Sequence, residues 1–247
     1  MTALELLLAF AGSFVAGALG SLVGLVLGSV RLPAVLLASG SPAAAAGTNI
    51  AVSAAAALSG GIAHARAGRV SWRIVGWMAP PSVAGAFAGG YVAHAVPSRL
   101  LLAGIAVVLA WNGLDLLLEL RAAPDSRRPR LAAVVAGGLI GLLGGAVGLI
   151  LGTLRLPALL RSVGLSAHMA VGTNLVVGFF LGAAGFAAHL VRLEVEWLVL
   201  LVSLAGAVPG AWLGARHAGR IPEEALRRLI GAALLLVAVA IAVAAAV

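Results

Sequence analysis

The chain has no cysteine and little charge: only 10% of its 247 residues are charged, against about 25% in soluble domains. The absence of cysteine excludes disulfides, thiol nucleophiles and cysteine-ligated metal sites. Because 62% of the residues are hydrophobic and the mean hydropathy is +1.15, the polar side chains are too few to cover a globule in water. The composition therefore predicts an all-α polytopic membrane protein.

Lysine is also absent, so the 16 basic residues are all arginine and give a net charge of +8. In a soluble protein this charge would suggest a nucleic-acid partner. Here the arginines stand singly or in short groups between apolar segments, where they are typical of residues that set membrane topology. We therefore expect no nucleic-acid partner. The N-terminus carries Glu5 and no basic residue before Arg31, so we interpret the first apolar run as a retained helix rather than a secretory signal.

The motifs of common enzymes are missing as well. The sequence has no GxxxxGK[ST] loop for nucleotide phosphates, no HExxH or GxSxG motif, and no carboxylate cluster. Its five histidines are scattered, which argues against a metal site. We expect neither catalysis nor a bound cofactor or metal.

Apolar segments long enough to cross a bilayer recur along the whole chain, since a crossing needs roughly 20 mostly apolar residues. One clearly polar linker, 121–130, falls near the midpoint. The predicted segments are 4–30, 43–63, 74–96, 99–118, 131–153, 166–190, 197–215 and 226–247.

The two sides of the linker repeat each other. GLVLGSVRLPAVL, from Gly24, matches GLILGTLRLPALL, from Gly148, at an offset of 124 residues. After one inserted residue the offset is 125, and GTN at 47–49 matches GTN at 172–174. This pattern predicts two tandem four-helix repeats, 1–120 and 131–247, joined by the linker 121–130 into one integrated membrane domain.

The repeated GxxxGxxRLP motif predicts that the first helix of each repeat is broken. Proline removes a backbone donor and disrupts the preceding turn, and a broken helix is tolerated in hydrocarbon only where protein or a watery cavity surrounds it. Matching Gly/Pro interruptions in two halves are typical of a transporter site near the bilayer midplane. The alternative is that Pro33 and Pro157 only end helices at the membrane surface.

Arg31 and Arg155 are the charged residues of this motif. An arginine at the bilayer centre costs about 2.5–3.5 kcal/mol even on the lenient insertion scale. A guanidinium that faces a cavity suits oxyanions because of its fixed donor fork. We therefore predict that both arginines bind an anionic substrate. The alternative is that both extend to the lipid headgroups.

The GTN motifs supply further candidates near the start of a segment in each half. Their glycines permit close approach of a ligand, and their hydroxyl and amide groups can hold an anion. Helix capping and interhelical hydrogen bonding are the alternative roles. Together with the arginines, the predicted substrate-binding residues are Pro33, Gly47, Thr48, Asn49, Pro157, Gly172, Thr173 and Asn174.

Three titratable residues could couple transport to protons. His64 and His189 occupy matching positions at the end of the second segment of each half. Asp115 lies about one turn deeper than Glu119 in the fourth segment, and it has no carboxylate counterpart in the second half. For each of them an ordinary structural role is the alternative.

The duplicated four-segment unit, the Gly-rich run ending at a proline and the G-T tetrads AGTN and VGTN resemble the TauE/SafE family. This family comprises sulfite and organosulfonate exporters and related small-anion permeases. The resemblance covers almost the whole chain, although Arg31 and Arg155 stand where the family usually has apolar residues, and Asn49 and Asn174 replace serine. It implies secondary transport of a small sulfur-containing or carboxylate anion.

The sequence therefore predicts a multi-pass permease of the cell membrane that works by alternating access around a midplane site between the repeats. The expected partners are a small anionic substrate and the lipid bilayer, with a homodimer as one further option. The arginine distribution favours cytoplasmic termini. The alternative function is a non-transporting subunit or scaffold of a membrane complex.

Overall fold

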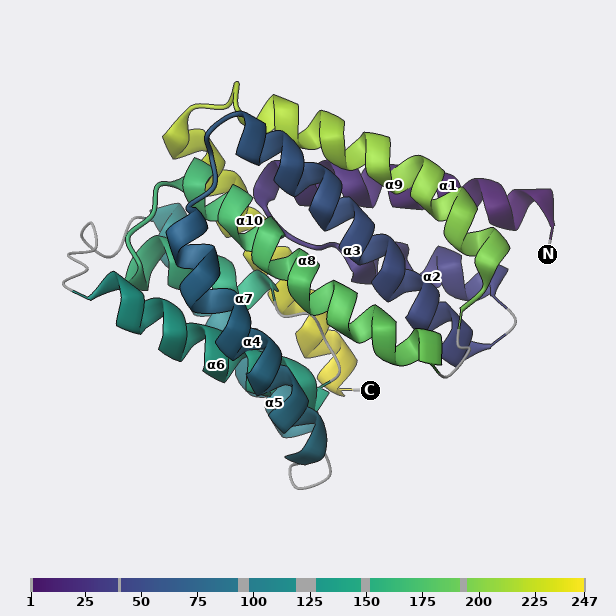
Figure 1. The fold of residues 1–247 in the computed structure, drawn as a ribbon, viewed down its shortest axis with the longest axis horizontal. Helices are drawn as coiled ribbons and strands as arrows, with labels where there is room; N and C mark the ends of the chain where they lie inside the picture. The colour runs from purple at the N-terminus through teal and green to yellow at the C-terminus, as the bar shows by residue number, and fades with distance from the viewer. Residues whose placement is uncertain are drawn as a thin grey trace. The chain divides into compact units, whose positions relative to one another are not determined.

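The computed structural model describes residues 2–39, 41–92, 98–118, 128–147, 152–191 and 195–246, and within them the fold is helical without a strand (Figure 1). The backbone polar groups are thereby paired inside each helix, as hydrocarbon requires. The helices are α1 (Ala3–Val23), α2 (Gly28–Ala38), α3 (Pro42–Arg66), α4 (Trp72–Val92), α5 (Ser98–Leu118), α6 (Pro129–Val147), α7 (Gly152–Pro157), the π-helix η1 (Ala158–Ser162), α8 (Ala167–Val191), α9 (Trp197–Ala218) and α10 (Glu223–Ala246).

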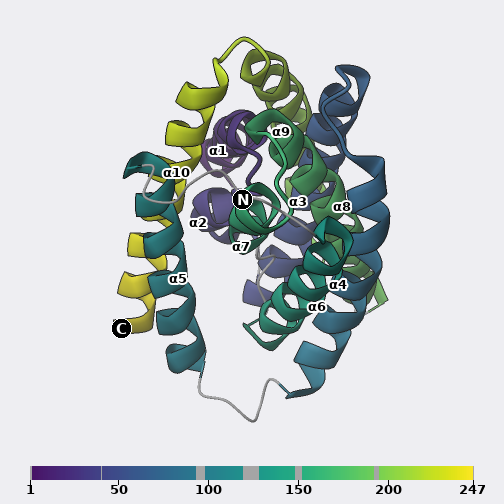
Figure 2. The same cartoon turned by 90° about the vertical axis from the view of Figure 1, so that its left-hand side faces the viewer.

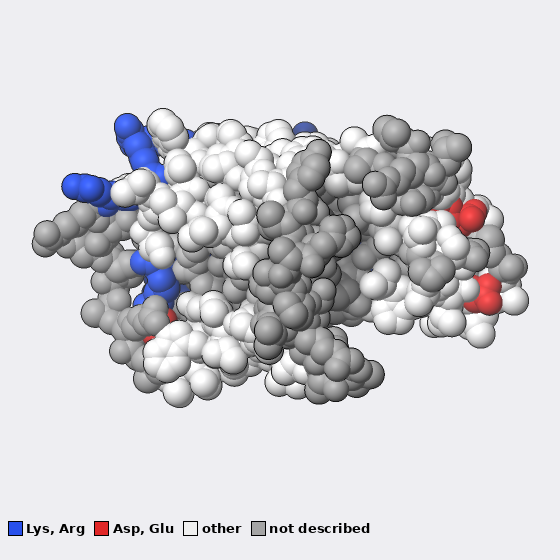
Figure 3. All heavy atoms as spheres, turned by 90° about the horizontal axis from the view of Figure 1, so that it is seen from below, with Lys and Arg blue, Asp and Glu red and all other residues white. Residues whose placement is uncertain are grey.

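Several helices carry a surface suited to lipid. Large apolar side chains such as Leu7, Val107 and Leu236 are more than half exposed, and charged atoms cover little of the described surface on the face drawn in Figure 3. The chain is therefore a multi-pass membrane protein, while the eightfold crossing and the tandem repeat stay predictions. Within the described residues, five helices are long and apolar enough to cross a membrane: Ala3–Val23, Ala43–Arg66, Ala167–Ala187, Trp197–Ala218 and Glu223–Val243.

The first predicted segment, 4–30, is interrupted at its glycines. Helix α1 ends at Val23, and Gly24 caps it in the left-handed conformation (φ 76°) with its N–H bonded to the carbonyl of Gly20. This conformation suits glycine, which has no Cβ to clash. Helix α2 then begins at Gly28 and contains Pro33. The break predicted within the Gly/Pro motif therefore lies at its glycines, whereas Pro33 lies inside α2.

The second repeated motif is described only from Gly152 onward, so a break over 148–151 lies outside the described residues. Pro157 is the last residue of α7, which continues directly into η1. In η1 the amide of Val163 bonds to the carbonyl of Ala158 at 2.9 Å, which is the i→i−5 pattern of a π-helix. Pro157 thus begins a change of helix type rather than the end of a helix.

Two compact units account for the packing: Met1–Val70 with Leu175–Arg220, and Ser71–Asn174 with Ile221–Val247. Each unit therefore contains helices from both predicted repeats. The predicted halves 1–120 and 131–247 describe the duplication in the sequence, whereas the compact units follow the packing. Of the linker 121–130, residues 121–127 lie outside the described residues.

In the first unit α9 lies along α1 and also packs on α3 (Figure 1). Small residues bring α1 and α9 together, as expected where no hydrophobic effect drives helices to associate. A Cβ on Gly17 would lie 2.6 Å from the carbonyl oxygen of Ala207. Cβ atoms on Gly210 and Gly214 would likewise strike backbone atoms of Phe14 and Ala18.

In the second unit α4 lies along α6, and α5 lies along α10 (Figure 2). The contact of α4 with α6 has the same register as that of α9 with α1. Gly141 occupies the place of Gly17 at an offset of 124, and a Cβ on it would strike the backbone of Ser82, which occupies the place of Ala207 at an offset of 125. In both units, the third segment of one half packs on the first segment of the other.

This packing predicts that Gly214→Ala lowers stability, because the added methyl group meets the backbone of α1. We expect a cost of about 1–3 kcal/mol, measured as a lower melting temperature of the detergent-purified protein. Gly76→Ala is the matched control, since nothing lies within 4 Å of its Cβ position. It should gain up to about 1 kcal/mol from helix propensity. Equal melting temperatures for the two variants would contradict the close approach.

Candidate functional site

The first motif arginine is buried and held by the GTN helix. Arg31 lies in α2 with 1% of its surface exposed. Its Nε donates to Asn49 Oδ1 at 2.7 Å, and its Nη2 donates to the carbonyl of Asn49 at 3.0 Å and to the hydroxyl of Ser53. The Ser53 hydroxyl in turn donates to the carbonyl of Asn49 at 2.8 Å. Arg31 thus joins the short helix after the break to α3.

The second motif arginine repeats this bond in the other unit. Arg155 lies in α7 and is fully buried, as is Asn174 in α8. Arg155 Nε donates to Asn174 Oδ1 at 3.0 Å, and Asn174 Nδ2 donates to the carbonyl of Gly152 at 2.8 Å. In each half, therefore, the arginine of the RLP motif is oriented by the asparagine of the GTN motif.

The two arginines differ in their terminal nitrogens. Among the described residues, Nη1 and Nη2 of Arg155 are buried and have no hydrogen-bond partner, whereas Nη2 of Arg31 has two. The sequence explains part of this difference, because the position of Ser53 is taken in the second half by Gly178, which has no side chain. Within the described residues, neither guanidinium forms an ion pair. A charge buried without compensation is unfavourable by several kcal/mol, so Arg155 is the stronger candidate for an anion ligand.

Glycines make room for both arginine–asparagine pairs. A Cβ on Gly152 would lie 3.3 Å from Nη2 of Arg155 and 3.4 Å from Nδ2 of Asn174. A Cβ on Gly28 would lie 2.8 Å from the hydroxyl of Ser53. A side chain at the second glycine of the repeated GxxxG would therefore crowd the arginine and asparagine side chains.

The GTN threonines accept hydrogen bonds from backbone amides directly before α9 and α4, the third helices of the two halves. Thr48 Oγ1 accepts from the amide of Glu196 at 2.9 Å, directly before α9. Thr173 Oγ1 accepts from the amide of Ser71 at 3.0 Å, directly before α4. Both threonines are fully buried. Each satisfies a backbone donor that the helix start would otherwise leave unpaired.

The other predicted binding residues are less alike in the two halves. Gly47 and Gly172 are both buried in their helices, whereas Pro33 is exposed and Pro157 is buried. A cavity of about 10 Å³ adjoins Arg31 and the interruption at Leu25–Leu27. This volume matches one water molecule rather than a substrate.

The predicted titratable residues have different surroundings. His64 is fully buried in α3, and its Nε2 lies 3.1 Å from the carbonyl oxygen of Ser21, to which it donates. His189, near the end of α8, is only partly buried. Asp115 is fully buried in α5, where its carboxylate pairs with Arg161 at 2.9 Å.

Comparison with known proteins assigns the chain to a family. The family described as "Sulfite exporter TauE/SafE" matches residues 9–241. The chain belongs to the TauE/SafE family. A "Probable membrane transporter protein" of Xylella fastidiosa (strain 9a5c) is 30% identical over 242 residues, which cover 90% of this chain and 91% of that protein. "Probable membrane transporter protein YunE" of Bacillus subtilis (strain 168) is 25% identical over 238 residues, 85% of this chain and 86% of that protein.

No solved structure matches the chain. The TauE/SafE family and the names of these relatives indicate a membrane transporter rather than an enzyme. In this member of the TauE/SafE family, the duplicated motif places a buried arginine next to an asparagine in each half.

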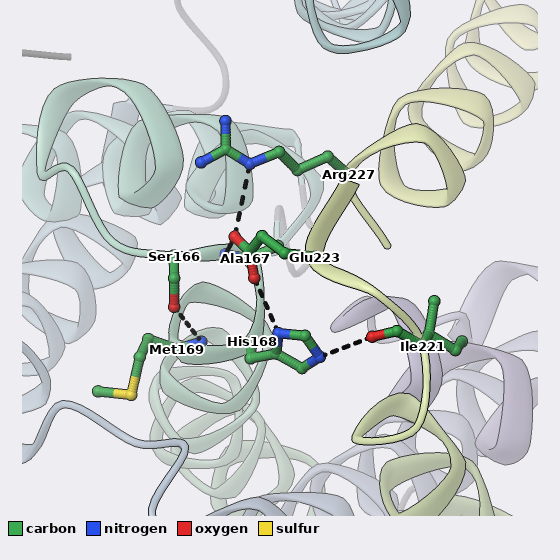
Figure 4. Close-up of polar contacts among 7 residues, drawn as sticks. All are labelled: Ser166, Ala167, His168, Met169, Ile221, Glu223 and Arg227. Atoms are coloured by element: carbon green, nitrogen blue, oxygen red, sulfur yellow. Dashed lines mark hydrogen bonds and ion pairs between the residues drawn. The ribbon is translucent and has the colours of Figure 1, made fainter. Parts of the chain in front are cut away.

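Sequence reasoning missed a polar cluster that fixes the start of α8, the helix that carries the second GTN motif (Figure 4). Glu223 accepts from the amide of Ala167, and its Oε2 lies 2.8 Å from Nδ1 of His168. His168 Nε2 donates to the carbonyl of Ile221 at 3.1 Å, and Arg227 Nε lies 3.4 Å from Glu223 Oε1. The signal in the sequence was an acidic residue at the predicted start of one helix and a histidine at the predicted start of another. Their contact joins the start of α10 to the start of α8.

Sequence reasoning also missed Ser53 and the partner of Asp115. Ser53 lies one turn after GTN in α3, a position where the second half has glycine. Arg161 lies next to the repeated motif in the sequence, yet it contacts Asp115 across a separation that no local pattern reveals. Asp115 and Arg161 both lack a charged counterpart in the other half, and this shared departure from the repeat was the signal that could have linked them.

The threonine bonds predict that Thr48→Val destabilises the protein. Valine has nearly the shape of threonine but cannot accept from the Glu196 amide, so we expect a cost of about 1–3 kcal/mol, measured by thermal unfolding in detergent. Thr48→Ser keeps the hydroxyl and should retain most of the stability. If valine and serine behave alike, the hydroxyl does not support the start of α9.

Proposed function

We propose that this protein is a secondary transporter that moves a small anion across the cell membrane by alternating access. The expected substrates are sulfur-containing oxyanions, organosulfonates or carboxylates. The family description names sulfite export, and the relatives are named as probable membrane transporters. Sulfite is therefore the first anion to test.

The observation that carries this proposal is the unpartnered donor fork of Arg155. Its Nη1 and Nη2 are buried without hydrogen bonds in the part of the chain that the structure describes, and its Nε is held by Asn174. A guanidinium can donate two parallel hydrogen bonds to the oxygens of a sulfonate, sulfite or carboxylate group. A bound oxyanion would therefore supply the counter-charge and the acceptors that this site needs.

The remaining motif residues support the site in different ways. Asn174 positions Arg155, and Gly152 leaves room beside the guanidinium. Arg31, in the other compact unit, joins α2 to α3 through its own hydrogen bonds. Thr48 and Thr173 hold the starts of α9 and α4, so that both GTN helices keep their place.

The proposal predicts that Arg155→Gln reduces sulfite uptake into proteoliposomes. The loss of a charged donor costs about 1.5–3 kcal/mol per hydrogen bond, equivalent to a ten- to hundredfold loss in apparent affinity. Without anion, the same variant should be as stable as the wild type or more stable, because an uncompensated buried charge is removed. Arg31→Gln should instead lower the melting temperature, since it leaves Asn49 and Ser53 without their partner.

Arg228→Gln is the control for charge, because Arg228 forms an exposed pair with Glu224 on α10. It should leave uptake unchanged. Normal sulfite uptake by an Arg31→Gln/Arg155→Gln double variant would contradict a role of either arginine in transport. The absence of uptake by the wild type for all tested anions would favour a non-transporting membrane subunit.

A further inference from the structure

A second buried charge pair in the chain departs from the repeat. Asp115 in α5 corresponds to Ala240 in the second half, and Arg161 in η1 corresponds to Leu36 or Leu37 in the first. The Nε of Arg161 lies 2.9 Å from Asp115 Oδ2, and its Nη2 donates to the carbonyl of Asp115 at 3.2 Å. The carboxylate side chain is 0% exposed and the guanidinium side chain 11%. The two charges without counterparts in the duplication therefore neutralise each other.

Arg161 lies within a π-helical turn. The amides of Val163 and Leu165 bond to the carbonyls of Ala158 and Leu159, both at 2.9 Å. A single π-helical turn within a helix often occurs at a functional site. Here it follows Pro157 of the repeated motif and carries the arginine that pairs with α5.

A cavity of about 530 Å³ lies beside this ion pair, between α5, α6, α7 and η1. Its polar lining comes from Asn112, Arg161 and Ser162. The remaining wall is apolar and includes Leu154 and Pro157, which flank Arg155 in the sequence. The volume is in the range of sites that enclose a small organic molecule.

We propose that this cavity binds an organic anion with an apolar body, and that the anion enters together with a proton. The anionic group takes the place of the Asp115 carboxylate on Arg161, and the apolar body lies against the wall formed by α5 and α6. Asp115 takes up the proton and becomes a neutral carboxylic acid. Arg161 stays cationic, so the net charge of the site is unchanged. This inference deepens the proposed function, on which its anionic substrate class rests.

The neighbouring charges support this assignment. The described helices that pack on α5 are α6, α7 and α10. On α10, Glu223 pairs with His168 and Arg227, and Glu224 pairs with Arg228. Arg161 is a charged group in contact with Asp115. The charged side chains described on these helices and on η1 are Arg130, Arg155, Arg161, Glu223, Glu224, Arg227 and Arg228.

The test is calorimetric titration of benzenesulfonate into the full-length protein in phosphatidylcholine nanodiscs. Titrations in two buffers of different ionisation enthalpy give the number of protons taken up. For the wild type we expect saturable binding, close to one proton taken up per anion, and weaker binding as the pH rises, because each bound anion requires a proton. Binding without proton uptake would overturn the proposal.

Asp115→Asn should abolish the proton uptake, make the affinity independent of pH, and bind more tightly than the wild type at high pH. Arg161→Gln should weaken binding about ten- to hundredfold. The single variant Arg161→Gln leaves Asp115 buried without Arg161. The double variant Asp115→Asn/Arg161→Gln therefore tests the loss of the guanidinium in a neutral site. Glu224→Gln, on the exposed surface of α10, should bind like the wild type. Wild-type affinity in the double variant would overturn the proposal.

Nanodiscs that also contain phosphatidylglycerol distinguish a soluble anion from a lipid headgroup. Unchanged affinity supports a soluble ligand, whereas competition that depends on Arg161 would make the cavity a lipid site and overturn the proposal. Sulfite uptake separates this inference from the proposed function. If uptake needs Arg155 while benzenesulfonate binding ignores Arg161, only the cavity proposal fails. If benzenesulfonate binding needs Arg161 while sulfite uptake ignores Arg155, only the transport site at Arg155 fails.

Discussion

The hydrogen bond from a buried arginine to the asparagine of GTN is the interaction on which each half of this protein depends. It joins the short helix of the RLP motif to the helix of the GTN motif, at 2.7 Å for Arg31 and 3.0 Å for Arg155. A guanidinium in a lipid-embedded protein is tolerated only when protein groups replace its water. The amide of asparagine supplies both an acceptor for the arginine and a donor for the backbone. The two motifs recur together because each is incomplete without the other.

The duplicated pairs have diverged in how completely they are satisfied. In the first half, Ser53 and the carbonyl of Asn49 fill the sites that Nη2 of Arg31 offers. In the second half, glycine replaces that serine, and the fork of Arg155 keeps free donors. One copy thus has a mainly structural arginine, and the other keeps an arginine with unused binding capacity.

Composition and periodicity were sufficient to predict the helices, because lipid leaves few alternatives to them. The predicted segment 43–63 corresponds to α3, and 197–215 to α9, with small differences at the ends. The sequence did not place the interruption, because Gly24 and Pro33 both disrupt helices and only the left-handed conformation of Gly24 decides between them. It pointed to Arg31 and Asn49 as separate candidates, but the bond between them depends on how two helices cross. The pairing of Asp115 with Arg161 was hidden for the same reason.

The third helix of each half packs on the first helix of the other half, and this arrangement affects the order in which the protein assembles. The glycine face of α1 packs on α9, and about 170 residues separate the two helices, so α1 leaves the ribosome long before its partner exists. During synthesis that face is covered only by lipid or by the insertion machinery. The partner of α4 is synthesised sooner, since α6 follows α4 with only α5 between them. Assembly in the membrane therefore finishes late, and truncation within the second half would leave α1 without its neighbour.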